Sequence, residues 1–348
     1  MARVVAVGTA VPPYRLDATA ARDVLIRAFA PRLDDARAVL RMAANAGVRE
    51  RYLSCPADDL LKPRSLGETN RRYAEMATAL AEQAARQALA RAGLPPTAID
   101  LVVTTSCTGY MLPALDACLV ERLGLRPETR RLPITELGCL AGAAALSYAV
   151  ALLAGLEART ALVIAVELPS LTFQPDDASM DNVVSALVFG DGAGAAVLRA
   201  DEGDGMALIA SRAAIVPGTL GAMGFDLRDD GFHVTLSKDV PRLLARPFAA
   251  AASALLADHG LAPGDLRFAC IHPGGPKILR AVDAALGAEG LTAPSWEVLA
   301  RFGNQSSAAV LFVLEQLFAT PPLDNTYGLL AAFGPGLSLE LGLLQWHG

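Results

Sequence analysis

The longest apolar segments of the chain predict two matched central helices. Between Glu136 and Glu157 lie 20 residues without a charge, and 13 uncharged residues separate Arg301 from Glu315. A helix that is apolar on every side is either buried in a large protein or spans a membrane. The first segment has no flanking excess of Lys or Arg, and its counterpart is too short for a bilayer. The pattern therefore favours two buried helices, and we expect no membrane span.

The chain also carries an internal duplication. Residues 88–109 resemble residues 254–275, each running from a helix end through a Gly cap and a Pro-containing turn into a β-rich strand. At an offset of 165 residues three pairs correspond, namely Asp100 with Asp265, Cys107 with His272, and Cys139 with Asn304. Strands that alternate with helices, repeated twice, predict an α/β fold in which two βαβ-type sheets sandwich the paired central helices. We expect an N-terminal half at 1–203 and a C-terminal half at 204–348.

Composition and charge narrow the classes of function. The 348 residues are 53% hydrophobic and 19% charged, which is typical of a globular chain. The net charge of −6 gives no general positive field for a nucleic-acid backbone, so we expect no nucleic-acid partner. The five cysteines lack the CxxC spacing of zinc sites, and the apolar run at 4–8 is too short for a secretory signal. We expect reduced thiols, no metal centre and a cytoplasmic location.

Cys139 stands where a predicted buried strand, Leu132–Gly138, gives way to the first central helix. A thiol at a helix N-terminus faces free N–H groups and the positive end of the helix dipole, which lower its pKa. The small residues Ala141 and Gly142 would leave space above the sulfur. The plain alternative is a structural cysteine, since cysteine is among the most commonly buried residues.

His272 and Asn304 are the candidate partners of this thiol. His272 ends the strand-like run Arg267–Ile271, where a histidine can act as a base or as the cationic partner of a thiolate, or can simply form a hydrogen bond in a turn. Asn304 opens the second central helix, where capping is the usual role of Asn. The duplication brings thiol, imidazole and amide toward one pseudo-twofold axis, so together they predict a nucleophilic site.

Other motifs are weaker. Gly190–Gly194 imitates a dinucleotide-binding loop, but it leads into a strand-like segment rather than a helix, so we expect a tight turn between strands. His233, His259 and His347 lie at unrelated positions and are expected to be surface or strand residues.

Nine blocks of the sequence resemble the type III polyketide synthases, the chalcone and stilbene synthase family. They run through nearly the whole chain: GVRERY (47–52), TTSCTGYMLP (104–113), ELGCLAGAAAL (136–146), LTFQPDD (171–177), ALVFGDGAGAAV (186–197), HVTLSKDVP (233–241), IHPGGPKIL (271–279), FGNQSSAAVLF (302–312) and AFGPGLSLE (332–340). The sequence looks most like bacterial members, including those that make phloroglucinol, tetrahydroxynaphthalene or alkylpyrones. The resemblance implies the thiolase-like fold, a layered αβαβα arrangement, and a homodimer with residues 111–113 near the subunit boundary.

The resemblance also implies a reaction. Cys139, as a thiolate paired with His272, would attack an acyl-CoA starter and carry the growing chain as a thioester. His272 and Asn304 would stabilise the enolate that malonyl-CoA forms on losing carbon dioxide. The enolate would then attack the Cys139 thioester in a Claisen condensation, and cyclisation would give a pyrone or a small phenolic product. Malonyl-CoA and an acyl-CoA starter are the implied partners, and no further cofactor is implied.

Matching of the motifs also assigns a pocket. Phe189 falls on the family's first gatekeeper phenylalanine, while Val234 replaces the second. Phe225 stands at a cavity glycine and Cys107 at a cavity threonine, and the remaining cavity residues that match are Thr172 and Ser306. For CoA, the matched positions are Arg41, Gly274 and Lys277. Starter, number of extensions and product stay open.

The alternatives use the same residues. A ketoacyl synthase III of fatty-acid initiation has the same Cys, His and Asn, but its histidine block usually reads His-Gln-Ala-Asn, whereas this chain has His272-Pro-Gly-Gly-Pro276. Thiolases use a second catalytic Cys near the C-terminus, and the last cysteine here is Cys270. A catalytically silent acyl-CoA-binding scaffold and a cysteine hydrolase are further alternatives.

Overall fold

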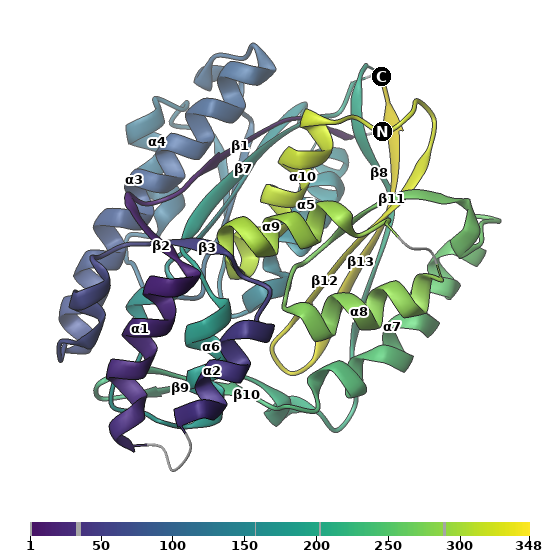
Figure 1. The fold of residues 1–348 in the computed structure, drawn as a ribbon. Helices are drawn as coiled ribbons and strands as arrows, with labels where there is room; N and C mark the ends of the chain where they lie inside the picture. The colour runs from purple at the N-terminus through teal and green to yellow at the C-terminus, as the bar shows by residue number, and fades with distance from the viewer. Residues whose placement is uncertain (1, 33–35, 157, 202, 288–289) are drawn as a thin grey trace.

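The structure is a computed structural model that describes residues 2–32, 36–156, 158–201, 203–287 and 290–348 (Figure 1). Its strands are β1 (Arg3–Ala10), β2 (Tyr14–Asp17), β3 (Glu50–Leu53), β4 (Leu101–Thr105), β5 (Arg130–Ile134), β6 (Thr160–Glu167), β7 (Gly192–Arg199), β8 (Gly205–Ile215), β9 (Met223–Arg228), β10 (Gly231–Leu236), β11 (Leu266–Ile271), β12 (Tyr327–Gly334) and β13 (Ser338–His347). Its α-helices are α1 (Ala18–Phe29), α2 (Ala36–Asn45), α3 (Leu66–Ala92), α4 (Leu115–Leu123), α5 (Ala141–Gly155), α6 (Met180–Val188), α7 (Val240–Ala257), α8 (Pro276–Leu286), α9 (Ala293–Phe302) and α10 (Ala309–Ala319).

Local sequence signals explain where these elements begin and end. The hydroxyl of Ser65 caps α3 in a reciprocal capping box with Glu68, and Gly93 ends that helix in the left-handed conformation with φ of 64°.

Every residue of β6 is buried, because helices cover both faces of the sheet there, and its sequence is accordingly a nearly continuous apolar run.

The main sheet has nine strands in the order β11-β12-β13-β8-β1-β7-β6-β4-β5. We expected two separate sheets. Instead the two halves are hydrogen-bonded into one sheet through a short antiparallel ladder in which Arg3 pairs with Ala207 and Val4 pairs with Met206. The joint is short because β1 continues along β7 while β8 continues along β13, so the strands diverge after two residues.

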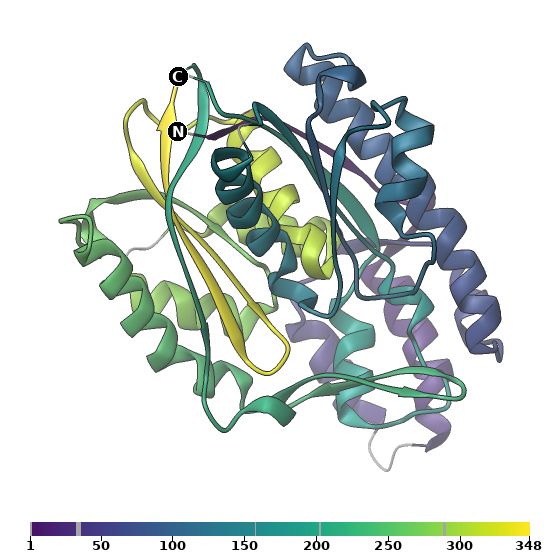
Figure 2. The same ribbon diagram turned by 180° about the vertical axis from the view of Figure 1, so that it is seen from behind.

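The layers follow the expected α/β thiolase-like arrangement (Figures 1 and 2). Helices α5 and α10 lie in the middle, between the two halves of the sheet, α3 and α4 cover the outside of the N-terminal half, and α7 and α8 cover the outside of the C-terminal half. Three hydrophobic clusters fill the spaces between these layers. The predicted central helices are therefore confirmed.

The helical segment Gly138–Gly155, which contains α5, has the length and composition of a membrane span, as does α7. In α5, however, 61% of the apolar window is buried within the molecule, where the helix packs against β4, β6 and β12. Most of the apolar side chains of α5 are thus covered by protein, whereas Tyr148 is exposed.

Three details of the sequence analysis need correction. The segment before Cys139 forms β5 over Arg130–Ile134, which is a partly exposed edge strand rather than a buried one, because only β4 pairs with it. Gly190–Gly194 connects helix α6 to strand β7 and is not a turn between two strands.

The third correction concerns the register of the duplication. Strands β4 and β11 keep the predicted offset of 165, since they begin at Leu101 and Leu266. The 3-10 turns that open α5 and α10 begin at Gly138 and Ser306, which is an offset of 168. The counterpart of Cys139 is therefore Ser307, and Asn304 lies three residues before it.

Candidate active site

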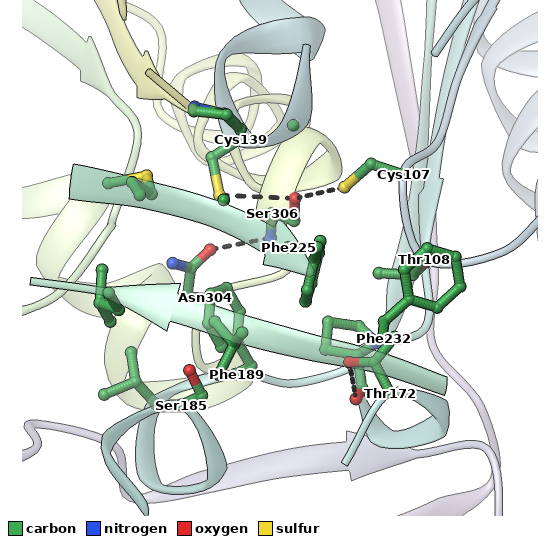
Figure 3. Close-up of a pocket in the computed structure, with 18 of the residues that line it drawn as sticks. Cys107, Thr108, Cys139, Thr172, Ser185, Phe189, Phe225, Phe232, Asn304 and Ser306 are labelled. Carbon is green, nitrogen blue, oxygen red and sulfur yellow. Dashed lines mark hydrogen bonds between the residues drawn. The ribbon is translucent and has the colours of Figure 1, made fainter. Parts of the chain in front are cut away.

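A cavity of about 750 Å³ lies where the N-terminus of α5 meets α6, the β9–β10 hairpin and the loop after β11. All three predicted reactive residues line it, namely Cys139, His272 and Asn304. So do the six residues predicted for the substrate pocket, Cys107, Thr172, Phe189, Phe225, Val234 and Ser306, together with Gly274. Figure 3 shows Cys139, Cys107 and Asn304 arranged around Ser306. Residues from both halves of the chain thus meet in one cavity.

Cys139 sits in the 3-10 turn Gly138–Leu140 that leads into α5. Gly138 has φ of 57°, and a Cβ there would lie 2.5 Å from the ring of Pro335, so only glycine fits beside the cysteine. The Cys139 sulfur donates a hydrogen bond to Ser306 Oγ at 3.5 Å. Burial raises the pKa of the Cys139 thiol to about 12, which outweighs the Ser306 hydrogen bond that lowers it. The expected lowering of the thiol pKa is therefore wrong, because desolvation dominates over the helix terminus.

His272 follows the last residue of β11, as predicted. Its backbone N–H donates to Ala331 O at 2.8 Å and fixes the residue against β12. Its side chain is only 2% exposed, and the ring atom Nδ1 is buried without a hydrogen-bond partner. Burial lowers the pKa of His272 to about 3. The imidazole is thus neutral, and its Nδ1 is left without a partner.

Asn304 is held by the backbone of the segment that carries Phe189. Its N–H donates to Val188 O at 2.8 Å, and its carbonyl accepts from Gly190 N at 3.1 Å. Its side-chain Oδ1 accepts from Ser306 N at 2.8 Å, which leaves Nδ2 turned away from Ser306 (Figure 3). Asn304 is therefore a fixed amide donor beside Phe189.

A buried carboxyl group was missed in the sequence analysis. Glu167 at the end of β6 is fully buried and accepts hydrogen bonds from Cys107 N at 3.1 Å, Thr108 Oγ1 at 2.9 Å and Ser307 Oγ at 2.5 Å. Burial raises its pKa. The available signal was a charged residue directly after the apolar run 161–166. This group orders the loop that carries Cys107 and the turn that precedes α10.

Arg51 belongs to a run of arginines for which the sequence favoured a solvated helix face or a clamp for CoA phosphates, but it is a buried residue of strand β3. It is 4% exposed, it lines the cavity, and its Nη1 donates to Phe189 O at 3.2 Å. Burial lowers its pKa to about 10, while the negative charge of Asp191 opposes that shift. Asp191 itself accepts from the backbone N–H groups of Ser54 and Ser170. Arg51 thereby helps to hold the backbone of Phe189.

Of the three residues predicted to bind CoA, one lines the cavity and two lie outside it. Gly274 lines the cavity against the His272 ring, where an added Cβ would lie 3.3 Å from Cδ2. Arg41 on α2 and Lys277 in the first turn of α8 are exposed and do not line the cavity. Their role toward CoA stays a prediction. Among the described residues, no three His, Cys, Asp or Glu side chains are arranged to hold a metal ion.

The comparisons with known proteins cover the whole chain. Residues 1–202 match the N-terminal domain model of the chalcone and stilbene synthases, and residues 207–346 match the C-terminal domain model. A 1,3,6,8-tetrahydroxynaphthalene synthase from Streptomyces peucetius subsp. caesius is 38% identical over 350 residues, which cover 99% of this chain and 93% of that protein. A phloroglucinol synthase from Pseudomonas fluorescens is 37% identical over 311 residues, 88% of each chain.

Solved structures agree with the sequence comparison. The crystal structure of 1,3,6,8-tetrahydroxynaphthalene synthase from Streptomyces coelicolor A3(2), a bacterial type III polyketide synthase, superposes with a TM-score of 0.95 at 32% identity and covers 99% of both chains. The chain therefore belongs to the chalcone and stilbene synthase family and is a type III polyketide synthase.

Proposed function

We propose that the chain builds polyketides from malonyl-CoA on the sulfur of Cys139. The observation that carries the proposal is the meeting of a thiol, a neutral imidazole and a fixed amide in one largely enclosed cavity, contributed by both halves of the chain. A thiolate at so buried a position needs a cation beside it, and His272 is the cavity base that can take the Cys139 proton. The thiolate then attacks the thioester carbonyl of a starter and releases CoA.

His272 and Asn304 have a second role in this proposal. When malonyl-CoA loses carbon dioxide, negative charge develops on its thioester oxygen. Donors held in place before the reaction stabilise such charge, and Asn304 Nδ2 is oriented for this by the Ser306 contact. The resulting enolate carbon attacks the Cys139 thioester, a new carbon–carbon bond forms, and the extended chain is left on CoA until Cys139 takes it up again.

The substrate class follows from the cavity and from the names of the relatives. Its walls are mostly apolar, and their polar groups include the hydroxyls of Thr172 and Ser306 and the thiol of Cys107, which suits a short chain carrying ketones. We propose a small phenolic product of the class that the related tetrahydroxynaphthalene and phloroglucinol synthases are named for. No cofactor beyond the CoA thioesters is proposed.

We further propose a cytoplasmic homodimer. The loop at 110–113 exposes large apolar side chains, with Tyr110 65% and Leu112 82% exposed, and Tyr148 on α5 is 41% exposed. Exposed apolar groups of this size favour a protein interface. Light scattering behind a sizing column tests this, and a monomer at micromolar concentration would refute it.

The test of the function is mass spectrometry of products. The enzyme is incubated first with malonyl-CoA alone and then with short, long and aromatic acyl-CoA starters, with Cys139→Ala as the matched inactive variant. A phenolic product from malonyl-CoA alone is expected, and it should vanish in Cys139→Ala. A pyrone formed only with one starter class would correct the product assignment. No polyketide with any starter would favour a silent scaffold instead.

A fatty-acid ketoacyl synthase III would condense once with malonyl groups carried on a protein. Neither the family match nor the relatives favour that alternative. A single condensation product in the same assay would revive it.

A further inference from the structure

The β9–β10 hairpin forms one wall of the cavity and has two chemically different faces. Cross-strand pairs place Phe225 opposite Val234 and Leu227 opposite Phe232. Since side chains alternate along a strand, these four residues share one face, and all four line the cavity. The other face carries His233 opposite Asp226, and Arg228 follows on the same face of β9, opposite Gly231. The sequence of the hairpin therefore turns an apolar wall inward and a polar face away from it.

His233 is buried although it belongs to the polar face. It is 7% exposed, and its two ring nitrogens reach different segments of the chain. Nε2 lies 2.9 Å from Asp230 Oδ1 in the turn of the hairpin, and Nδ1 lies 3.5 Å from Asp177 Oδ2 in the loop that precedes α6. Arg228 Nη1 also approaches Nδ1 at 3.2 Å. A single imidazole thus connects the hairpin to a loop about 55 residues earlier in the chain.

Two more side chains fasten the same loop and helix to β10. Gln174 Nε2 donates to Phe232 O at 3.3 Å, and Asp181 Oδ2 accepts from Leu236 N at 2.8 Å. Gly231 has φ of 143°, and a Cβ there would lie 2.7 Å from Gln174 Nε2, so glycine makes room for this contact. Contacts therefore occur at both ends of β10 and at His233 between them.

The fastened loop is itself part of the cavity. Thr172 and Phe173 line the cavity just before Gln174, while Asn182 Nδ2 ties the loop into a compact turn by donating to Gln174 O and Asp177 O, both at 2.7 Å. The contacts of His233 consequently fix the position of the hairpin wall relative to the loop wall. The space between these walls is where a growing chain has to fit.

We propose that His233, held between Asp177 and Asp230, is a positioning residue that sets the length of the polyketide by fixing the β9–β10 wall of the cavity. This inference rests on the proposed function. Without the imidazole, the side-chain hydrogen bonds that remain between β10 and the loop and helix α6, within the described residues, are those of Gln174 and Asp181. The apolar wall then moves outward, and the cavity admits a longer chain or a larger starter. His233 touches no reacting atom, and the decarboxylation of malonyl-CoA does not depend on it.

The test compares product distributions of His233→Ala and Asp230→Ala with those of Asp229→Ala. Asp229 is the matched control, because it is an exposed aspartate in the same turn and, within the described part of the chain, makes no hydrogen bond or ion pair. We expect the ratio of longer to shorter products to change at least threefold in the first two variants, with release of carbon dioxide within twofold of the wild type. Asp229→Ala should give the wild-type ratio.

Two results would overturn the inference. One is an unchanged product ratio in a folded His233→Ala protein, and the other is an equal change in Asp229→Ala. If His233→Ala does not fold, His233→Gln replaces it, because glutamine retains a donor toward Asp230 but loses the ring contact with Asp177. Wild-type product ratios from both His233→Gln and Asp230→Ala would then refute the role. Absence of polyketides from the wild type would instead refute the proposed function itself.

Discussion

At the scale of single residues, the chemistry of the cavity depends on groups that burial keeps neutral. Burial raises the pKa of Cys139 to about 12 and lowers that of His272 to about 3. Both shifts have the same cause, since a low-polarity surrounding disfavours whichever form is charged. The thiolate of Cys139 and the imidazolium of His272 therefore form together as an ion pair. Other negative charge develops on the substrate, where donors that are already in place stabilise it.

Asn304 provides the sharpest residue-scale prediction. Its side chain lines the cavity, while its position is set by backbone bonds to Val188 and Gly190 that alanine retains. We expect Asn304→Ala to slow the decarboxylation of malonyl-CoA by about 10²–10³-fold, the usual loss for one oxyanion donor. Carbon dioxide release measures this.

Starter loading in Asn304→Ala is the control for the loss of decarboxylation. Cys139 and His272 are intact in Asn304→Ala, so an acyl-CoA starter should still load onto the enzyme, as intact-protein mass would show. Equal losses of loading and decarboxylation would contradict a separate role for the amide.

At the scale of elements, the site depends on how closely α5 and α10 cross. They approach closely at Gly142, where an added Cβ would lie 2.0 Å from the backbone oxygen of Ser307, in the turn before α10, and 2.8 Å from the side chain of Val310. Ser307 also binds Glu167, and Ser306 contacts Cys139. The helix crossing thus positions the nucleophile and the carboxyl group that orders its surroundings.

We therefore expect Gly142→Ala to destabilise the protein by about 1–3 kcal/mol, as overpacked cores generally do. Gly155 at the end of the same helix has open space around it and is the matched control. Gly155→Ala should leave the melting temperature within about 1 °C or raise it slightly, since alanine loses less entropy on folding. Thermal unfolding of both variants decides this, and equal effects would argue against the close crossing.

The elements also show what could be predicted from sequence. The central helices, strand β11 and the meeting of Cys139, His272 and Asn304 were predictable, because long apolar runs and a repeated pattern determine them. The register of the duplication at Cys139 was not predictable, because the 3-10 turn before α10 shifts it by three residues. Glu167 was missed and the solvated position expected for Arg51 was wrong, because a sequence does not show which charged residues are buried.

At the scale of the whole molecule, buried polar contacts connect the two halves of the chain across the central layer. Glu340 on β13 is 2% exposed and accepts a hydrogen bond at 2.7 Å from Ser147 Oγ on α5. Burial raises the pKa of Glu340, and the serine contact opposes that shift only partly. This carboxyl group joins a strand of the C-terminal half to a helix of the N-terminal half.

Glu340 makes the stability of the protein depend on pH. Because its pKa is higher in the folded than in the unfolded state, its contribution is most favourable below the unfolded pKa and is lost as pH rises through the folded pKa. Glu340→Gln retains an acceptor for Ser147 and removes the titration. We expect its melting temperature to exceed that of the wild type by about 2–4 °C at pH 8, and the gap to shrink toward pH 5.

Glu128→Gln, at an exposed position, is the control and should show no such trend. A gap that is constant across pH, or that widens toward pH 5, would contradict the assigned direction of the pKa shift.

The most direct test of the central claim is to find the growing chain on Cys139. Trypsin releases residues 132–159 as one peptide, in which Cys139 is the only cysteine. After rapid quenching of a reaction with carbon-13-labelled malonyl-CoA, this peptide should carry a ladder of labelled thioester adducts that differ by one ketide unit. An unmodified peptide from an enzyme that is forming product, or adducts only on a peptide that contains Cys107, would contradict the account.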